Sequence, residues 1–299
     1  MKEVPRIIGK YTGSEKGPLL LVTAGVHGNE PSGVKALQKI FSLLEEHQPS
    51  MKGTFLGLSG NRKALEQGKR FIDEDLNRTW TRKNLEKDAP ESHEQQEMFE
   101  IIEVLKEYSK DNYSARYFKH CHTTSSDSLP YISVQEVGKN DEFAHNFPVN
   151  IVRGFSDIGD GSIDKYFSKT GMTGFTFEAG QHDSEDSLAN QEAMIWLALR
   201  EASELDTSAV PRFAEAIKVF EDDEAKGQTT YKILYRHGIE NIEKFSMEPG
   251  FSNFEKIEKG QLLAVQDGIQ VKSTWDATIF MPLYQAQGND GFFVIEEVK

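Results

Sequence analysis

The chain has 299 residues with 34 lysines and arginines against 48 aspartates and glutamates, which gives a formal charge of -14 at pH 7. Such acidity, with no block rich in lysine and arginine, argues against nucleic acid or an anionic membrane as a partner. A single cysteine, Cys121, excludes an internal disulfide framework and favours a reducing compartment, so we expect a cytoplasmic protein. We expect no signal segment, and no apolar run approaches the roughly 20 residues that a membrane-spanning helix needs.

Predicted strands and helices alternate along the first two thirds of the chain. Residues 19–22, Leu-Leu-Leu-Val, form a continuous apolar run bounded by proline and glycine, which is typical of a strand buried on both faces. Apolar residues at helical spacing after Pro31 predict a helix. The further expected elements are strands at 54–58, 115–121 and 174–177, a helix after Ser92 that carries Phe99, Ile102 and Leu105, and a helix over 188–202 with Ile195, Trp196 and Leu199 inward. This alternation favours an α/β fold whose helices cover a sheet, with parallel strands expected.

The character of the sequence changes near residues 205–211. Here Asp206-Thr207-Ser208 separates the last strong helix from a segment with short strands and turns that contain glycine. We therefore expect a catalytic domain over 1–208 and a smaller β-rich domain over 209–299. The elements expected in the second domain are a helix at 212–220 and strands at 229–235, 261–266, 270–271, 277–281 and 292–295.

Residues suited to metal binding and to acid–base chemistry follow three of the predicted strands. His27 and Glu30 are three residues apart in a turn from a strand into a helix, so their side chains can reach one ion. His122 and Glu178 each follow another strand. Two imidazoles and one carboxylate are the ligand set of a catalytic zinc that keeps one position open for water, and the second glutamate would supply a base. These residues predict a zinc hydrolase.

Four segments in combination resemble one known family. They are Val26-His27-Gly28-Asn29-Glu30, Asp75-Leu76-Asn77-Arg78, His122-Thr123-Thr124-Ser125 and Phe177-Glu178-Ala179-Gly180. Over residues ~20 to 182 the chain resembles the succinylglutamate desuccinylase/aspartoacylase family, whose members are relatives of the zinc carboxypeptidases. The resemblance implies a carboxypeptidase-like α/β domain, with a mixed sheet flanked by helices, followed by a small β domain that covers the active-site entrance.

The resemblance also implies a role for each matching residue. Zn²⁺ would be held by His27, Glu30 and His122, and Glu178 would act as general base and acid. The remaining matches are Arg70, which would polarise the scissile carbonyl, Asn77 and Arg78, which would bind the substrate's α-carboxylate, and Tyr284, which would contact the substrate. A guanidinium offers two parallel donors to a carboxylate, which a lysine does not.

The implied reaction is hydrolysis of the amide bond of an N-acyl amino acid to a carboxylic acid and a free amino acid. The expected partner is thus a small-molecule substrate, with formation of a homo-oligomer left open. A zinc carboxypeptidase acting on peptides is one alternative, which a C-terminal domain over the site would exclude. A non-catalytic carboxylate-binding homologue is the other, and Glu178 and Arg70 argue against it because binding a carboxylate needs neither.

His120 departs from the family pattern, because an aspartate usually stands two residues before the third ligand. Residues two apart in a strand share a face, so His120 and His122 should point toward the ion and Cys121 away from it. His120 is then either an alternative ligand or a neighbour that accepts a hydrogen bond from a ligand imidazole less strongly than a carboxylate would. The second interpretation is favoured, since three protein ligands complete a catalytic zinc site.

Overall fold

The computed structural model describes residues 1, 3–155, 158, 160–182, 184–221 and 227–298. The first part contains β1 (Ile7–Thr12), β2 (Glu15–Ala24), α1 (Ser32–His47), β3 (Lys52–Ser59), α2 (Arg62–Gln67), α3 (Arg82–Leu85), α4 (His93–Lys106), β4 (Arg116–Thr124), β5 (Tyr131–Ser133), α5 (Asn140–Ala144), β6 (Asn150–Arg153), α6 (Ile163–Lys169), β7 (Thr173–Gln181) and α7 (Glu185–Ser203). The remainder contains α8 (Phe213–Ala216), β8 (Thr230–Gly238), β9 (Phe245–Met247), β10 (Lys256–Ile257), β11 (Leu262–Gln266), β12 (Ile269–Lys272), β13 (Ala277–Phe280) and β14 (Asp290–Glu297). No helix in these ranges is long and apolar enough to cross a membrane.

One large mixed sheet runs through both parts of the molecule. Among the described residues its strand order is β1-β3-β2-β4-β7-β5-β6-β8-β14-β13-β10, and β12-β11-β9 form a second sheet. Strands β3, β2, β4 and β7 are parallel to one another, whereas β5 is antiparallel to β7. The predicted α/β fold with a β-rich C-terminal region is therefore confirmed.

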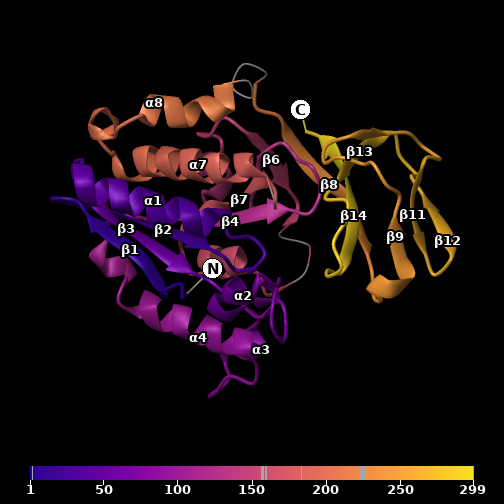
Figure 1. Ribbon diagram of the computed structural model, residues 1–299, viewed down its shortest axis with the longest axis horizontal. Helices are drawn as coiled ribbons and strands as arrows, with labels where there is room; N and C mark the ends of the chain where they lie inside the picture. The colour runs from indigo at the N-terminus through magenta and orange to yellow at the C-terminus, as the bar shows by residue number, and fades with distance from the viewer. Residues whose placement is uncertain (2, 156–157, 159, 183, 222–226, 299) are drawn as a thin grey trace.

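The apolar run of β2 is buried on both faces, as its composition predicts. Leu20 and Val22 pack in a cluster with residues of α1 and α7, whereas Leu19 and Leu21 pack in a second cluster with residues of α4 and α6. Figure 1 shows α1, α7 and α8 on one side of the sheet and α4 on the other. Alternate side chains of one strand thus hold the two helical layers against the sheet.

Helix α4 begins where the sequence predicts. The hydroxyl of Ser92 accepts a hydrogen bond from the backbone N–H of Gln95, as expected of a cap. The fully buried apolar residues are Met98 and Ile101, next to the buried carboxylates of Glu94 and Glu97. The apolar residues named in the sequence prediction, Phe99, Ile102 and Leu105, are half-buried against the same cluster. The most buried face of α4 therefore combines apolar and acidic side chains.

The segment that follows residue 208 still packs on the first part of the molecule. Val210, Phe213 and Phe220 belong to the same apolar cluster as α1 and α7. The helix predicted at 212–220 is divided into α8 and a 3-10 turn at Ile217–Phe220. The strands predicted beyond it are confirmed in β8, β11, β12, β13 and β14.

Candidate active site

Three potential metal ligands meet at one edge of the sheet. His27 and Glu30 lie in the turn between β2 and α1, and His122 lies near the end of β4, the parallel neighbour of β2. The Nδ1 atoms of His27 and His122 lie 2.7 and 2.8 Å from the two carboxylate oxygens of Glu30. All three side chains are buried, and one ligand atom from each lies within 4.8 Å of the others. The group could therefore hold a metal ion, and its donor set is that of an open zinc site.

The turn that carries these ligands approaches its neighbouring segment closely. A Cβ atom on Gly28 would lie 2.0 Å from the carbonyl carbon of Ala64, so a side chain does not fit there. The N–H of Gly28 also donates to the carbonyl oxygen of Arg70 at 3.2 Å. The glycine between His27 and Glu30 thus brings the ligand turn directly against the segment of Arg70.

The electrostatics of the metal-free group favour a cation. Burial opposes the charged form of Glu30, but the two histidines outweigh it and hold the pKa of this carboxyl well below its ordinary value. Burial lowers the pKa of His122, which keeps this imidazole neutral with a lone pair to donate. Burial and Arg70 also act to lower the pKa of His27, but Asp75 and Glu30 outweigh them and raise it.

Asp75 holds the far side of the His27 ring. Its Oδ1 lies 2.9 Å from Nε2 of His27, and its Oδ2 accepts from the Arg70 guanidinium at 3.0 Å. Burial opposes ionisation of Asp75, but His27 and Arg70 hold its pKa well below the ordinary value. A carboxylate in this position fixes the ring and raises the basicity of the ligand. Sequence reasoning gives Asp75 no such role, and its place in the motif Asp-Leu-Asn-Arg is the signal that was available.

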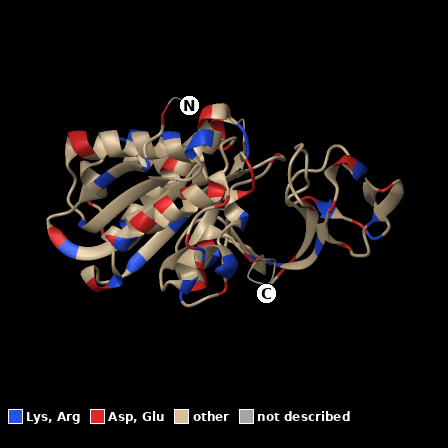
Figure 2. Ribbon diagram, turned by 90° about the horizontal axis from the view of Figure 1, so that it is seen from below, with Lys and Arg blue, Asp and Glu red and all other residues tan. Residues whose placement is uncertain are grey.

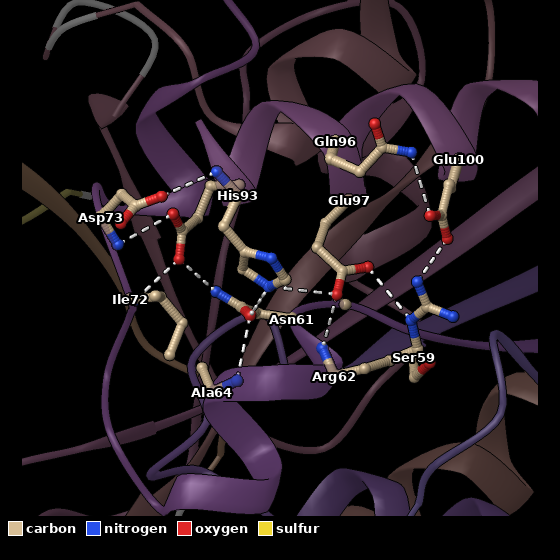
Figure 3. A network of polar contacts seen from close by, with 12 residues as sticks. Ser59, Asn61, Arg62, Ala64, Ile72, Asp73, His93, Gln96, Glu97 and Glu100 are labelled. Atoms are coloured by element: carbon tan, nitrogen blue, oxygen red, sulfur yellow. Dashed lines mark hydrogen bonds and ion pairs between the residues drawn. The ribbon is translucent and has the colours of Figure 1, made fainter. Parts of the chain in front are cut away.

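A buried carboxylate on α4, Glu94, fixes the segment that carries Arg70 and Asp75. Its two oxygens accept four hydrogen bonds of 2.7 to 3.1 Å. The donors are the side-chain amide of Asn61 and the backbone N–H groups of Ile72, Asp73 and Glu74. Figure 3 shows three of these partners, Asn61, Ile72 and Asp73, gathered in this network. The backbone between Arg70 and Asp75 is thus held by groups that do not touch the cavity.

Glu178 lies near the end of β7, opposite His122 in the register of the parallel strands. Its side chain lines the same cavity, and its Oε2 is buried without a hydrogen-bond partner in the described part of the chain. Burial and the nearby Glu30 raise the pKa of Glu178 well above its ordinary value, against the lowering effect of Arg70. A carboxyl group in such surroundings is suited to proton transfer near neutral pH.

These side chains line a cavity of about 160 Å³ that both parts of the chain enclose. The predicted site residues that line it are His27, Glu30, Arg70, Asn77, Arg78, His122 and Glu178. The lining residues for which sequence reasoning gives no firm role include Gln135, Asp164, His182 and Asp290. The segment from Met281 to Phe293 contributes the wall on the side of the β-rich region.

The two residues predicted to bind a carboxylate already have partners. The Asn77 side chain accepts from the N–H of Ile163 at 3.0 Å and places its amide nitrogen 3.4 Å from Nε2 of His122. The half-exposed guanidinium of Arg78 lies 3.4 Å from Oδ2 of Asp290, at the start of β14. An acidic side chain of the β-rich region therefore faces the arginine that is predicted to bind the substrate.

Tyr284 is not among the residues that line the cavity. Its hydroxyl donates to the carbonyl oxygen of Glu248 at 2.7 Å and accepts from the N–H of Phe251 at 2.9 Å. Its neighbours Leu283 and Gln285 line the cavity instead. The tyrosine thus anchors the wall segment within the β-rich region.

His120 shares a face with His122 but does not join the ligand group. The two rings meet edge-on with centroids 4.4 Å apart, and Nδ1 of His120 lies 2.7 Å from Oγ1 of Thr23. On the opposite face, a Cβ atom on Gly33 of α1 would lie 2.6 Å from Cβ of Cys121. The prediction that Cys121 points away from the two histidines is confirmed.

The chain is similar in sequence to known succinylglutamate desuccinylases. A succinylglutamate desuccinylase of Pseudomonas paraeruginosa is 29% identical over 91 residues, which cover 30% of this chain and 27% of that protein. Another, from Shewanella putrefaciens, is 23% identical over 297 residues, which cover 89% of this chain and 78% of that protein. The match to the first of these relatives thus spans only about a quarter of its length.

Two solved structures share the fold. A succinylglutamate desuccinylase/aspartoacylase from Rhodobacter sphaeroides superposes with a TM-score of 0.69 at 16% identity, over 97% of this chain and 88% of that one. Murine aminoacylase 3 superposes with a TM-score of 0.63 at 15% identity, over 96% and 97% of the two chains. A family model, the succinylglutamate desuccinylase/aspartoacylase catalytic domain, matches residues 16–201. The chain therefore belongs to the succinylglutamate desuccinylase/aspartoacylase family.

Proposed function

We propose that this protein is a zinc-dependent hydrolase that cleaves the amide bond of an N-acyl amino acid. The observation that carries the proposal is the buried group of His27, Glu30 and His122, with Glu178 beside it at one cavity. Family membership supports the class of chemistry, because the relatives bear the names succinylglutamate desuccinylase and aminoacylase. The products are a carboxylic acid and a free amino acid.

The two histidines and Glu30 would hold the zinc ion. Zinc, when bound, lowers the pKa of a coordinated water to about 7 and polarises a carbonyl. Glu178 takes a proton from the water whose oxygen bonds to the carbonyl carbon, and it gives that proton to the amine nitrogen as the C–N bond breaks. Such transfer is worth typically about 10²–10⁴-fold in rate. Arg70 stabilises the negative charge on the carbonyl oxygen, an effect of about 3 kcal/mol in comparable sites.

Asn77 and Arg78 would hold the α-carboxylate of the leaving amino acid. The Arg78 guanidinium faces the carboxylate of Asp290, which supports a role in binding an anion. A substrate carboxylate would take the place of Asp290 at this guanidinium.

The enclosure of the cavity favours small substrates over peptides. Its volume of about 160 Å³ lies below the roughly 300 Å³ at which pockets for drug-sized ligands begin. The wall from the β-rich region supports our proposal that a domain over residues 209–299 covers the entrance to a catalytic domain over 1–208. Acidic and basic residues are interspersed along both parts (Figure 2), which fits a small-molecule partner better than a polyanion. The cytoplasm remains the proposed compartment on the ground of one cysteine.

The test is a screen of N-acetyl, N-formyl and N-succinyl amino acids against the zinc-loaded protein, with release of free amine as the readout. N-succinylglutamate belongs in it because of the relatives' names. We expect hydrolysis of at least one compound, and a loss of about 10²-fold or more in Glu178→Gln with zinc retained. Alanine variants of His27, Glu30 and His122 should each lose zinc. Absence of turnover at full zinc occupancy, or Glu178→Gln activity within about threefold of wild type, would refute the proposal.

A further inference from the structure

A buried carboxylate outside the ligand group lines the cavity without a cationic partner. Asp164, in the first turn of α6, is 6% exposed. It accepts from the side-chain amide of Gln135 at 2.9 Å and from the backbone N–H of Lys165 at 2.8 Å, and both donors are neutral. The Lys165 ammonium pairs with Asp160 instead, and none of the ion pairs within the described ranges includes Asp164. A carboxylate withdrawn from water is costly unless a cation and hydrogen bonds compensate it.

A buried acceptor with no hydrogen-bond partner among the described residues lies beside this carboxylate. The side chain of Gln135 is 4% exposed and lines the cavity, and its Oε1 has no hydrogen-bond partner in the part of the chain that the structure describes. The carboxylate of Asp164 determines the orientation of this amide, because it binds the amide nitrogen and would repel the oxygen. Buried acceptors in native proteins are normally matched by a donor. A donor group of a ligand in the cavity would match this oxygen.

The floor between this pair and the catalytic glutamate is polar. Ser133 of β5 lies opposite Thr176 of β7, and both residues line the cavity. Thr176 stands two residues before Glu178 in the same strand, so the two side chains share a face. Thr176 and Ser133 therefore supply a strip of hydroxyl groups beside Glu178, and Ser133 stands two residues before Gln135 in the chain.

The position of Asp164 indicates which part of the substrate Asp164 and Gln135 would contact. It favours the leaving amino acid over the acyl group. The preceding residue, Ile163, donates its N–H to Oδ1 of Asn77. Asn77 is one of the two residues proposed above to hold the α-carboxylate. A side chain that extends from the same α-carbon would thus reach toward Asp164.

The arginines that line the cavity do not pair with Asp164. Among the described lining residues they are Arg70, which pairs with Asp75, and Arg78, which faces Asp290. An acidic substrate side chain would meet the carboxylate of Asp164 and be repelled. A primary ammonium group would instead satisfy that carboxylate, the free oxygen of Gln135 and the hydroxyl strip.

We infer that the protein acts on N-acyl diamino acids, whose side-chain ammonium group binds at Asp164 and Gln135. This inference rests on the proposed function, since it names the substrate class of the same cavity. It assigns specificity to residues that neither touch the metal ligands nor take part in proton transfer.

Binding of the free product amino acids tests the inference without relying on turnover. Calorimetric titration of the zinc-loaded protein should show that ornithine binds at least about tenfold more tightly than norleucine, its apolar near-isostere, or glutamate, because a charge-assisted hydrogen bond is worth about 1.5–3 kcal/mol. In Asp164→Asn the preference should fall to within about threefold, since the amide still accepts from Gln135 but carries no charge. Asp88→Asn is the control, because that carboxylate is exposed and does not line the cavity.

Thr176→Val offers a milder variant that keeps the shape of the floor. We expect about threefold weaker binding of ornithine and unchanged binding of norleucine, because one hydrogen bond is lost. Equal binding of the three amino acids to the wild type, tighter binding of glutamate, or a preference that survives Asp164→Asn would overturn the inference. A protein that prefers ornithine but hydrolyses no N-acyl amino acid would refute the proposed function alone.

Discussion

Asp75 determines how the His27 ring meets a metal ion, because it holds the nitrogen on the far side of the ring. We expect Asp75→Asn to weaken zinc binding by about 10–100-fold while the protein stays folded. Competition with a chromogenic chelator measures the change. Asp88→Asn, an exposed carboxylate, is the control. Zinc affinity of Asp75→Asn within about twofold of wild type would show that the contact is incidental.

Zinc binding should begin to weaken at a higher pH than it would with a ligand histidine of ordinary pKa. The pKa of His27 in the metal-free protein is raised, because Asp75 and Glu30 outweigh burial and Arg70. As the pH falls through this raised pKa, His27 gains a proton that zinc must displace, so affinity declines below it and is constant above it. Zinc titrations across about pH 6 to 8.5 should show that the affinity for zinc begins to fall at a pH above the ordinary histidine pKa of about 6.5. In Asp75→Asn the affinity should begin to fall at a lower pH than in the wild type. If this pH does not change, Asp75 is not the cause of the effect.

His120 should contribute little to zinc binding. Its Nδ1 is already bonded to Thr23, and the group of potential ligands is complete without it. We expect the zinc affinity of His120→Ala to stay within about tenfold of wild type, because loss of a group that only contacts a ligand typically costs about 10–100-fold. His122→Ala should lose zinc. Dialysis followed by metal analysis distinguishes the two variants. Equal and complete loss in both would make His120 a ligand.

The sequence predicts candidate site residues that follow strands. It does not predict those whose place in the site depends on tertiary contacts. His27, His122 and Glu178 could be predicted, because the strands that precede them are visible in the local sequence pattern and parallel strands end at one edge of a sheet. Asp164 comes from a seven-residue helix and Gln135 from the loop that follows a three-residue strand, and neither stands in a motif. Their relation exists only once β5 pairs with β7.

Helix α4 supports the site from outside through Glu94. In Glu94→Gln one of the two oxygens becomes an NH₂ group that faces backbone donors, so we expect a loss of about 3 kcal/mol in the free energy of unfolding. Weaker zinc binding should accompany this loss, because the segment of Arg70 and Asp75 is released. Urea unfolding and zinc titration measure the two effects. Glu103→Gln, an exposed residue of the same helix, should change neither, and unaltered zinc binding in Glu94→Gln would limit Glu94 to a role in stability.

Elements with a strong one-dimensional pattern were predictable, and several of the shortest ones were not. The apolar run of β2 and the amphipathic spacing of α1 each extend over enough residues to identify the element. β5, β6 and β10 have three, four and two residues, too few for a periodicity to emerge. The burial of Glu94 and Glu97 on α4 could not be predicted, because charged residues are rarely buried and nothing local marks these two.

We expect the contact between Arg78 and Asp290, which joins the two parts of the molecule, to compete with substrate. We expect Asp290→Asn to lower KM for carboxylate-bearing substrates by about threefold with kcat unchanged, a modest effect because the pair is partly exposed. Steady-state kinetics test this, with the exposed Asp276→Asn as control. A raised KM would mean that Asp290 positions Arg78 for binding.

The pairing of β6 with β8 joins the β-rich region to the sheet that carries His122 and Glu178. A hinge between the two parts would have to break backbone hydrogen bonds within a continuous sheet, so we expect the mouth of the cavity to keep a fixed width. Substrates would then be sorted by size exclusion at a rigid aperture rather than by closure of one lobe upon another. Opening of a lobe would then not limit the release of product. We therefore expect kcat to be insensitive to solvent viscosity.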